Sequence, residues 1–360
     1  MMFKNDVTEL LQIDYPIIQA PMAGGVTNSI LVASVSNHGG LGMIGAGYMN
    51  PAQTRDQIRE IRQLTSNYFG INLFVPHEFN ASANEITSAN QFLQPIREQL
   101  SIPIEKNNEL PEYERAFANF NEQIKIVIEE RVPVCSFTFG LPSKEVINKL
   151  KEKNITVLGT ATTVREAMEV EKRGMDMVVV QGCEAGGHRG NFMNDFQESL
   201  IGLMSLVPQV VDNVRIPVIS AGGIMDGRGL MASLCLGAKG VQMGTAFLTC
   251  VESGAHKVHK EAVLQSNEDQ SVLTRVFSGK WARGIKNKFI SKMQEHETSF
   301  PDFPIQNALT QDIRKKSASQ NNKEFMSLWA GQSPRLAKNQ TVETLIKNII
   351  TEAKEIINGI

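Results

Sequence analysis

Cysteine is scarce in this chain of 360 residues, which has only Cys135, Cys183, Cys235 and Cys250. No two of them form a Cys-x-x-Cys pair, and none stands at a zinc-like spacing from a histidine. The sequence therefore predicts no metal site. Three of the four lie in strongly apolar runs, where cysteine behaves as a small hydrophobic residue. We expect small buried thiols in a protein of the reducing cytoplasm.

An excess of either charge is also absent, because 36 basic side chains face 38 acidic ones and the formal net charge is -2. This balance gives no electrostatic reason to expect nucleic acid as a partner. No apolar stretch approaches the roughly 18 residues that a membrane helix needs. Residues 1–11 lack the apolar centre of a signal peptide. We expect a soluble, cytoplasmic protein without membrane partners.

Short apolar runs dominate what the sequence does contain. Each is followed by a stretch with helical character, and several runs are rich in Val and Ile, as fully buried parallel strands are. Alternation through eight strands predicts an α/β fold in which the sheet closes into a (β/α)8 barrel, the TIM barrel. The runs are Pro16–Met22, Gly40–Gly47, Tyr68–Val75, Val132–Gly140, Thr156–Thr163, Met177–Gly182, Pro217–Ile224 and Gly240–Leu248.

The spacing predicts a barrel formed by residues 1–75 and 132–250, with an insertion over 76–131 between strands three and four. The insertion is polar in its first part and helical over Tyr113–Glu130. Long insertions in barrels usually lie at or around the active-site face. We expect residues 251–360 to form a helical segment that packs on the barrel. Within it, Ser317–Lys323 is predicted as a loop and Thr341–Ile357 as a helix.

Helices are also predicted between the strands, and two carry terminal signals. Pro51 stands at a first helical position, and Ser143 is a candidate N-cap. The predicted helices are Asn28–Asn37, Pro51–Leu64, Ser143–Lys153, Val164–Arg173, Ser199–Val211 and Gly227–Leu236.

Two glycine turns mark the ends of the last two strands, at Gly222-Gly223 and at Gly244-Thr245. Barrels often bind phosphate in the loops after strands seven and eight. Glycine lets backbone N–H groups approach phosphate oxygens closely, and the N-terminus of a nearby helix, here near Gly227, favours negative charge. These turns predict a phosphate site.

The sixth run ends in Gln181, and a glycine pair, Gly186-Gly187, precedes His188. The Gln181 amide suits hydrogen bonding to the polar edge of a ring system. The glycines let the chain pass close to a flat ligand, and His188 becomes a candidate acid, base or anion-orienting group. A structural or surface histidine is the alternative. Arg189 and Glu184 read equally well as an ion pair of the loop.

The first run ends in Gln19-Ala20-Pro21-Met22-Ala23-Gly24-Gly25, where small residues leave room for a bulky planar ligand. Asn72 is a polar residue inside the apolar third run, where it needs a partner when buried. That partner is either a neighbouring side chain or a cofactor. A phosphorylated, planar, hydrogen-bonding heterocycle satisfies these features together, and flavin mononucleotide (FMN) is such a molecule.

These residues resemble the class I nitronate monooxygenases, formerly called 2-nitropropane dioxygenases. The resemblance spans most of the chain, and its specificity comes from the combination of motifs rather than from any one of them. The matching stretches are PIIQAPMAGGVTN (16–28), SNHGGLGMIGAGY (36–48), GINLFVP (70–76), VVVQGCEAGGHRGNF (178–192), VISAGGIMDGRG (218–229), GAKGVQMGTAFL (237–248) and FSGKWARGIKN (277–287).

The resemblance implies that His188 is the catalytic histidine beside FMN. It implies oxidation of alkyl nitronates by molecular oxygen to a carbonyl compound and nitrite, a detoxification activity for which propionate 3-nitronate is one candidate substrate. Many members carry histidine where this chain has Thr138, which puts the substrate range in doubt. A homodimer is one open arrangement. The FMN contacts implied are Ala20, Pro21, Met22, Asn72, Gln181, Gly186, Gly223, Gln242, Met243, Gly244 and Thr245.

Other functions remain open at this point. A flavin-dependent enoyl-acyl-carrier-protein reductase shares the barrel, the glycine pair with its histidine and the FMN site, but consumes NAD(P)H. An inosinate dehydrogenase-like barrel would use Cys183 as a nucleophile, although no activating base stands beside it. A flavin-binding barrel without catalysis would have no need of His188. The basic stretch from Lys280 to Lys292 reads as a solvated face, or as a source of Lys280 or Arg283 near the pocket.

Overall fold

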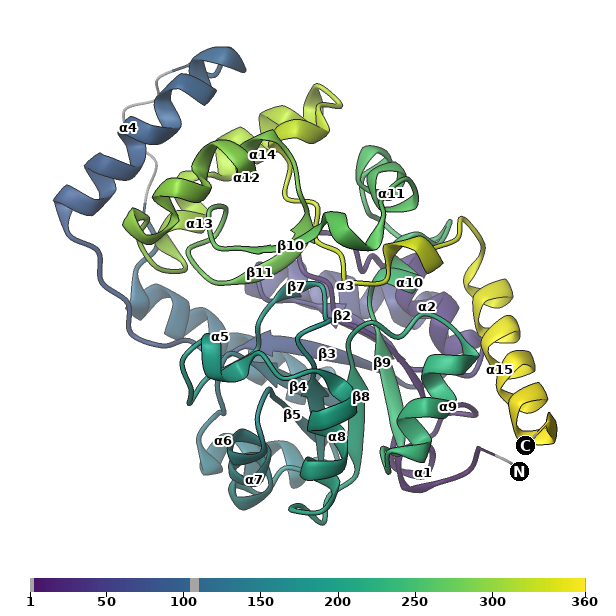
Figure 1. Ribbon diagram of the computed structural model, residues 1–360. Coiled ribbons are helices and arrows are strands. Elements are labelled where there is room, and N and C mark those ends of the chain that lie inside the picture. Colours follow the sequence, from purple (N-terminus) through teal and green to yellow (C-terminus); the bar gives the residue numbers. More distant parts are fainter. Residues whose placement is uncertain (1–2, 104–109, 360) are drawn as a thin grey trace.

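Eight parallel strands form the centre of the molecule, in the order β1-β9-β8-β6-β5-β4-β3-β2 (Figure 1). This computed structural model describes residues 3–103 and 110–359. A parallel bridge from Ile18 to Leu41 joins β1 to the β2 side and closes the sheet, which confirms the predicted barrel. All eight predicted strands are present: β1 (Ile17–Gln19), β2 (Gly42–Gly45), β3 (Phe69–Phe74), β4 (Val134–Thr138), β5 (Thr156–Ala161), β6 (Met177–Gln181), β8 (Val218–Ala221) and β9 (Gly240–Met243).

The strands are short and mostly buried, because helices cover their outer side and side chains fill the barrel interior. In each predicted run the last residues leave the strand and form the loop at its carboxyl end. The barrel helices are α2 (Ser29–Asn37), α3 (Pro51–Leu64), α5 (Tyr113–Glu129), α6 (Lys144–Lys151), α7 (Val164–Arg173), α8 (Leu203–Val211), α9 (Gly227–Cys235) and α10 (Thr245–Leu248), and α1 (Asp6–Leu11) precedes β1.

Local signals place the ends of several helices where the sequence predicts them. Pro51 is the first residue of α3, and the Asn50 side chain accepts a hydrogen bond from the Gln53 amide in a capping box. The Ser143 side chain caps α6 by accepting a hydrogen bond from the Val146 amide. These contacts satisfy N–H groups that a helix start leaves without an intrahelical partner.

The segment between β3 and β4 contains two helices, although the sequence predicts only the second. Its polar first part forms α4 (Ala83–Gln99), which begins with a capping box between Ser82 and Glu85. We predicted no helix there, because capping residues and a polar exposed face look like a loop in sequence. The second helix, α5, packs against α3 and β3 as a crossover helix of the barrel does.

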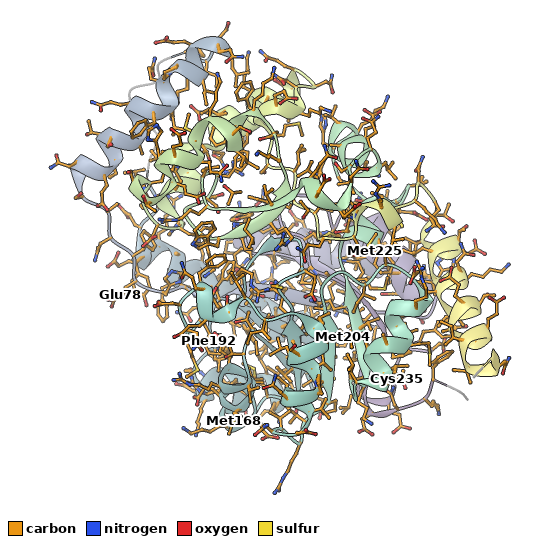
Figure 2. The ribbon with its side chains drawn as sticks, viewed as in Figure 1. Glu78, Met168, Phe192, Met204, Met225 and Cys235 are labelled. Atoms are coloured by element: carbon orange, nitrogen blue, oxygen red, sulfur yellow. The ribbon has the colours of Figure 1, made fainter. Side chains whose placement is uncertain are left out.

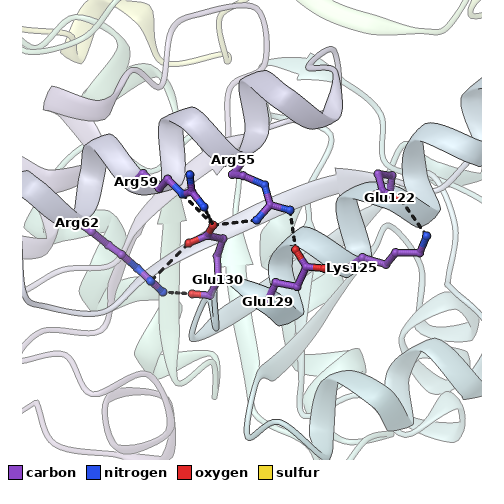
Figure 3. Close-up of polar contacts among 7 residues, drawn as sticks. All are labelled: Arg55, Arg59, Arg62, Glu122, Lys125, Glu129 and Glu130. Carbon is purple, nitrogen blue, oxygen red and sulfur yellow. Dashed lines mark hydrogen bonds and ion pairs between the residues drawn. The ribbon is translucent and has the colours of Figure 1, made fainter.

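The α3–α5 contact is reinforced by a cluster of charges (Figure 3). The Glu130 carboxylate lies 3.0 Å from Arg55 and 2.9 Å from Arg59, and Arg62 approaches it at 3.7 Å. Arg55 also pairs with Glu129 at 2.6 Å. This network fastens the end of α5 to α3.

The C-terminal segment contains strands as well as the predicted helices. β10 (Ser271–Thr274) and β11 (Ala282–Ile285) pair in antiparallel fashion, and β11 also pairs with the two-residue strand β7 (Gly187–His188). The predicted loop at Ser317–Lys323 is only partly one, since α14 continues to Ser319. The remaining helices are α11 (Lys257–Leu264), α12 (Lys288–Met293), α13 (Ile305–Leu309), α14 (Gln311–Ser319) and α15 (Val342–Gly359).

The inserted helix α4 and the C-terminal segment share a hydrophobic core of their own. Ala89, Leu93 and Ile96 of α4 join Phe277 and Phe289 of the C-terminal segment in one buried cluster. Figure 1 shows α4 beside α12, α13 and α14, on the same side of the barrel as β10 and β11. The two additions to the barrel therefore form one covering layer over that end.

The cysteines are less uniformly buried than we expected. Cys135 and Cys250 are buried, but Cys183 is partly accessible, and Cys235 is exposed at the end of α9 (Figure 2). Across residues 3–103 and 110–359, no helix is both long and apolar enough to cross a membrane. In the same ranges, no group of three or more His, Cys, Asp or Glu side chains is arranged to hold a metal ion.

Candidate active site

A cavity of about 190 Å³ opens at the carboxyl ends of the barrel strands, and we call it the inner cavity. Every predicted site residue except Met243 lines it. Met243 points away, is 1% exposed and packs in the hydrophobic core with Ile17 and Val241. The predicted residues that the inner cavity brings together are Ala20, Pro21, Met22, Asn72, Gln181, Gly186, Gly187, His188, Gly222, Gly223, Gln242, Gly244 and Thr245.

The two glycine turns lie side by side at one end of the inner cavity. Gly222 and Gly223 have φ values of +136° and +64°, which residues with a side chain rarely adopt. The Gly223 amide donates to no protein group in the described ranges, and the Thr245 amide at the start of α10 has no intrahelical acceptor. Free, convergent amides at this place fit a phosphate group.

The helix N-terminus near Gly227 does not serve this site, contrary to our expectation. The Asp226 side chain caps α9 by accepting hydrogen bonds from the amides of Arg228 and Gly229. The Gly227 amide donates to Glu352 of α15 at 2.9 Å. These carboxylates already satisfy the start of α9, whereas the first amide of α10 has no intrahelical acceptor.

A strap from the C-terminal segment, residues 329–333, covers this end of the inner cavity. The Gly331 amide donates to the Thr245 hydroxyl at 2.9 Å, and the Ser333 hydroxyl donates to the Gly223 carbonyl at 3.0 Å. The strap also explains why residue 186 is a glycine. A Cβ on Gly186 would stand 2.5 Å from the carbonyl carbon of Ala330 and from the Gly331 nitrogen. Gly186 therefore admits protein backbone rather than only a flat ligand.

His188 lies in β7, paired with Ala282 of β11, and its ring faces the inner cavity. Its Nε2 is 2.8 Å from the Ser278 hydroxyl, which itself donates to the Lys280 carbonyl at 3.0 Å. Since the Ser278 proton is used for Lys280, the network favours the tautomer in which Nε2–H donates to Ser278. Nδ1 then keeps its lone pair and has no hydrogen-bond partner in the described ranges.

The surroundings of His188 disfavour its protonated form. Burial, followed by the positive charges of Lys280 and Arg314, lowers the pKa of His188 to about 3. Burial also lowers the pKa of Lys280, to about 8. The imidazole is therefore neutral at pH 7, with two cationic groups nearby.

Three aromatic rings surround the His188 imidazole. Their centroids lie 5.4 Å away for Trp329, 5.9 Å for Phe139 and 6.0 Å for Phe303. Phe139 has φ +70°, a left-handed conformation that costs a residue with a side chain about 1–2 kcal/mol. We did not predict these neighbours. Trp329 and Phe303 come from the C-terminal segment, and no local signal links them to His188.

Polar contacts fix the loop that carries His188. The Gln181 amide donates to the His188 carbonyl at 3.0 Å and accepts from the Gly190 amide at 2.8 Å. Arg189 is fully buried, and its guanidinium donates to the carbonyls of Gly182, Gln181 and Ser199. Arg189 thus pairs with backbone oxygens, and the ion pair with Glu184 that we considered is not formed.

Asn72 hydrogen-bonds to neighbouring side chains, which is one of the two kinds of partner that its position suggested. Its amide nitrogen donates to the hydroxyls of Ser136 at 2.8 Å and Thr138 at 3.0 Å, while the residue lines the inner cavity. Both amide protons are used, so Oδ1 is the atom left for a ligand. Thr138 therefore has a definite role here, since it helps to orient Asn72.

The basic stretch from Lys280 to Lys292 has some of its side chains on the surface and others in the interior. Lys286, Lys288 and Lys292 are exposed, as a solvated face predicts. Arg283 is buried and donates to the carbonyls of Cys183 and Ser271. Burial raises the pKa of the Cys183 thiol, which makes this cysteine a poor nucleophile and disfavours an inosinate dehydrogenase-like reaction.

Comparisons with known proteins agree with this geometry. A family model described as nitronate monooxygenase matches residues 4–352. Proteins called "Probable nitronate monooxygenase" from Staphylococcus aureus strains MSSA476 and MRSA252 are each 51% identical over 98% of both chains. The structure of nitroalkane oxidase from Streptomyces ansochromogenes covers 99% of both chains with a TM-score of 0.89 and 35% identity. FabK from Thermotoga maritima covers 99% of this chain and 98% of its own with a TM-score of 0.78 and 32% identity.

Proposed function

This chain belongs to the nitronate monooxygenase family of enzymes, and we propose that it uses FMN and molecular oxygen to convert alkyl nitronates into a carbonyl compound and nitrite. Removal of toxic nitronates in the cytoplasm, propionate 3-nitronate among them, is the biological role that we propose. The observation that carries the reaction is the charge around His188. No Asp or Glu lines the inner cavity in the described part of the chain, whereas Lys280 and Arg314 lie near the ring. Such a cavity suits an anion.

We propose that the inner cavity is the FMN site, because backbone amides and polar side chains line it. We propose that the amides of Gly223 and Thr245 hold its phosphate, with Gly222 and Gly244 allowing the close approach. We propose that the rest of FMN is surrounded by the apolar residues Ala20, Pro21 and Met22 and by the polar side chains of Asn72, Gln181 and Gln242. When bound, FMN supplies the electron transfer between substrate and oxygen that protein side chains lack.

We propose that His188 is the base that removes a proton from the α-carbon of a neutral nitroalkane. The ring is neutral, and the lone pair of Nδ1 is not used by the protein. A nitronate formed beside the ring would raise the pKa of His188, because an adjacent negative charge favours the imidazolium. Lys280 and Arg314 contribute long-range attraction for the same anion.

The first experiment asks whether the purified protein carries flavin. Oxidised flavin bands in the visible spectrum are expected, and their absence after supplementation with FMN would refute the cofactor. A preformed nitronate is then supplied in air while nitrite and oxygen are measured. In parallel, NADPH is followed with a crotonyl thioester. Nitronate-dependent oxygen uptake without NADPH supports the proposal, whereas thioester-dependent NADPH loss selects an enoyl reductase.

The second experiment separates proton removal from later steps through His188→Ala. We expect flavin content to be kept, and kcat/KM for a neutral nitroalkane to fall by about 10²–10⁴-fold, the usual contribution of a general base. The kcat/KM value for the preformed nitronate should fall much less, because its α-carbon has already lost the proton that the base would remove. Equal losses for the two substrates would reject the base role.

A further inference from the structure

A second cavity of about 420 Å³ lies next to the inner cavity, and we call it the outer chamber. It is enclosed by the loops after β2 and β3, by α5 and by the chain around α13. None of the reacting groups discussed above belongs to it. Most of its lining residues come from the inserted segment and the C-terminal segment, the two parts added to the barrel, and the rest come from the ends of β2, β3 and β4.

Three aromatic residues, Tyr48, Phe74 and Phe139, line both cavities. The Tyr48 and Phe74 centroids are 5.5 Å apart, and those of Phe74 and Phe139 are 4.5 Å apart. Phe303, which lines the outer chamber, lies 5.7 Å from Phe139 and 6.0 Å from the His188 ring. Ring side chains therefore stand where the two cavities meet, and Phe303 of the outer chamber lies close to the His188 ring.

The interior of the outer chamber is largely apolar. Glu112 and Arg115 carry opposite charges and are both exposed, so they lie toward its solvent side. Such a pair favours neither a positively nor a negatively charged substrate tail. A hydrocarbon tail, in contrast, is bound more favourably because its apolar surface leaves water. The apolar lining residues are Met49, Phe74, Val75, Phe79, Leu110, Ala116, Phe120, Phe139, Phe303 and Ala308.

We propose that the outer chamber binds the hydrocarbon part of the substrate, so that the preferred substrates are nitronates bearing an extended alkyl chain or an aryl group. The nitronate end lies at His188, and the chain passes the rings of Tyr48, Phe74 and Phe139. Flat aromatic faces suit such a passage because they contact hydrocarbon without requiring hydrogen bonds. This assignment of substrate class rests on the proposed function.

Chain length provides the first test. Ethyl, butyl, hexyl and octyl nitronates are compared by initial rates of nitrite release, with a carboxylate-bearing nitronate alongside. We expect kcat/KM to rise by about three- to fourfold for each added methylene that becomes buried. A flat series, or a preference for the carboxylate-bearing substrate, would overturn the assignment. Failure of every nitronate to react, ethyl nitronate included, would instead refute the proposed function.

Matched substitutions on α5 provide the second test. Ala116 lines the outer chamber, whereas Ala118, two residues along the same helix, is exposed and outside it. Ala116→Phe should lower the ratio of octyl to ethyl nitronate kcat/KM at least tenfold, and Ala118→Phe should leave the ratio unchanged. Equal ratios in the two variants would contradict the proposal.

A binding measurement makes the test independent of turnover. Alkanoates carry a planar anionic end like that of a nitronate, so calorimetry with acetate, hexanoate and decanoate reports tail binding alone. The dissociation constant should fall with chain length in the wild-type protein and in Ala118→Phe. In Ala116→Phe it should no longer fall beyond acetate. If decanoate binds both variants equally, the outer chamber is not the tail site.

Discussion

The strap over the end of the inner cavity that holds the two glycine turns leads to a sharp prediction about two neighbouring glycines. Gly186→Ala places a Cβ 2.5 Å from the Ala330 carbonyl carbon and 2.5 Å from the Gly331 nitrogen. Ordinary contacts between such atoms are about 3.5–4.0 Å, so the strap must move by about 1 Å. Overpacking of this kind costs about 1–3 kcal/mol.

The displacement has consequences for the site as well as for stability. The strap carries the hydrogen bond from Gly331 to Thr245, and Trp329 at its start lies beside His188. A shift of about 1 Å from the strap's normal contact distances would lengthen that hydrogen bond beyond useful geometry. We therefore expect Gly186→Ala to lower both the free energy of unfolding in urea and the affinity for FMN, measured by flavin fluorescence.

Gly187 supplies the control, because it differs from Gly186 in the kind of constraint. A Cβ there meets nothing within 4 Å, but its φ is +73°. Asparagine tolerates the left-handed region better than alanine does. Gly187→Asn should therefore be milder than Gly186→Asn in both measurements. If Gly186→Ala is as stable as wild type, or if the order of the two asparagine variants is reversed, the steric argument is wrong.

Two further predictions concern stability. Burial lowers the pKa of His259 to about 4, so between pH 6.5 and pH 4 the unfolded chain binds a proton that the folded chain does not; the contribution of His259 to the unfolding free energy should fall by about 2 kcal/mol from pH 7 to pH 5, in addition to the decrease that His188 causes. His259→Leu should reduce the pH dependence by this amount in urea titrations, and an unchanged slope would refute the assignment. Burial raises the pKa of Glu130, but Arg59 and Arg55 outweigh it and hold the pKa low. Glu130→Ala should cost about 1–2 kcal/mol in urea at low salt, less at high salt, with nitronate turnover unchanged; equal costs at both salt concentrations would contradict the charge network.

The barrel and the two glycine turns of the site follow from local sequence patterns. Each strand is a short apolar run, and each glycine turn stands at the end of one, so a run and its last residues suffice to place these turns. Gly222, Gly223 and Thr245 come together for this reason. Met243 shows the limit of the method, because strand residues alternate sides and this one faces the core.

The surroundings of His188 could not be predicted from local sequence patterns, because they depend on contacts between distant parts of the chain. Ser278, Phe303 and Trp329 lie far along the sequence from His188, and nothing in the sequence links any of them to it. The pairing of β7 with β11 also could not be predicted from the sequence, since the two residues of β7 give no periodic pattern. Only the packed fold determines the tautomer of His188 and the charge around it.

The division between the barrel and the added segments has a consequence for how substrate preference can change in this fold. The residues proposed to hold the cofactor phosphate belong to the barrel, whereas Phe303 and most of the outer chamber belong to the added segments. Changes in the added segments can therefore alter the hydrocarbon that is accepted without disturbing the phosphate turns. The strap limits that freedom, because residues 329–333 contact Gly186, Gly223 and Thr245 directly. Variation is thus least constrained around α5 and α13, which is where the proposed tail site lies.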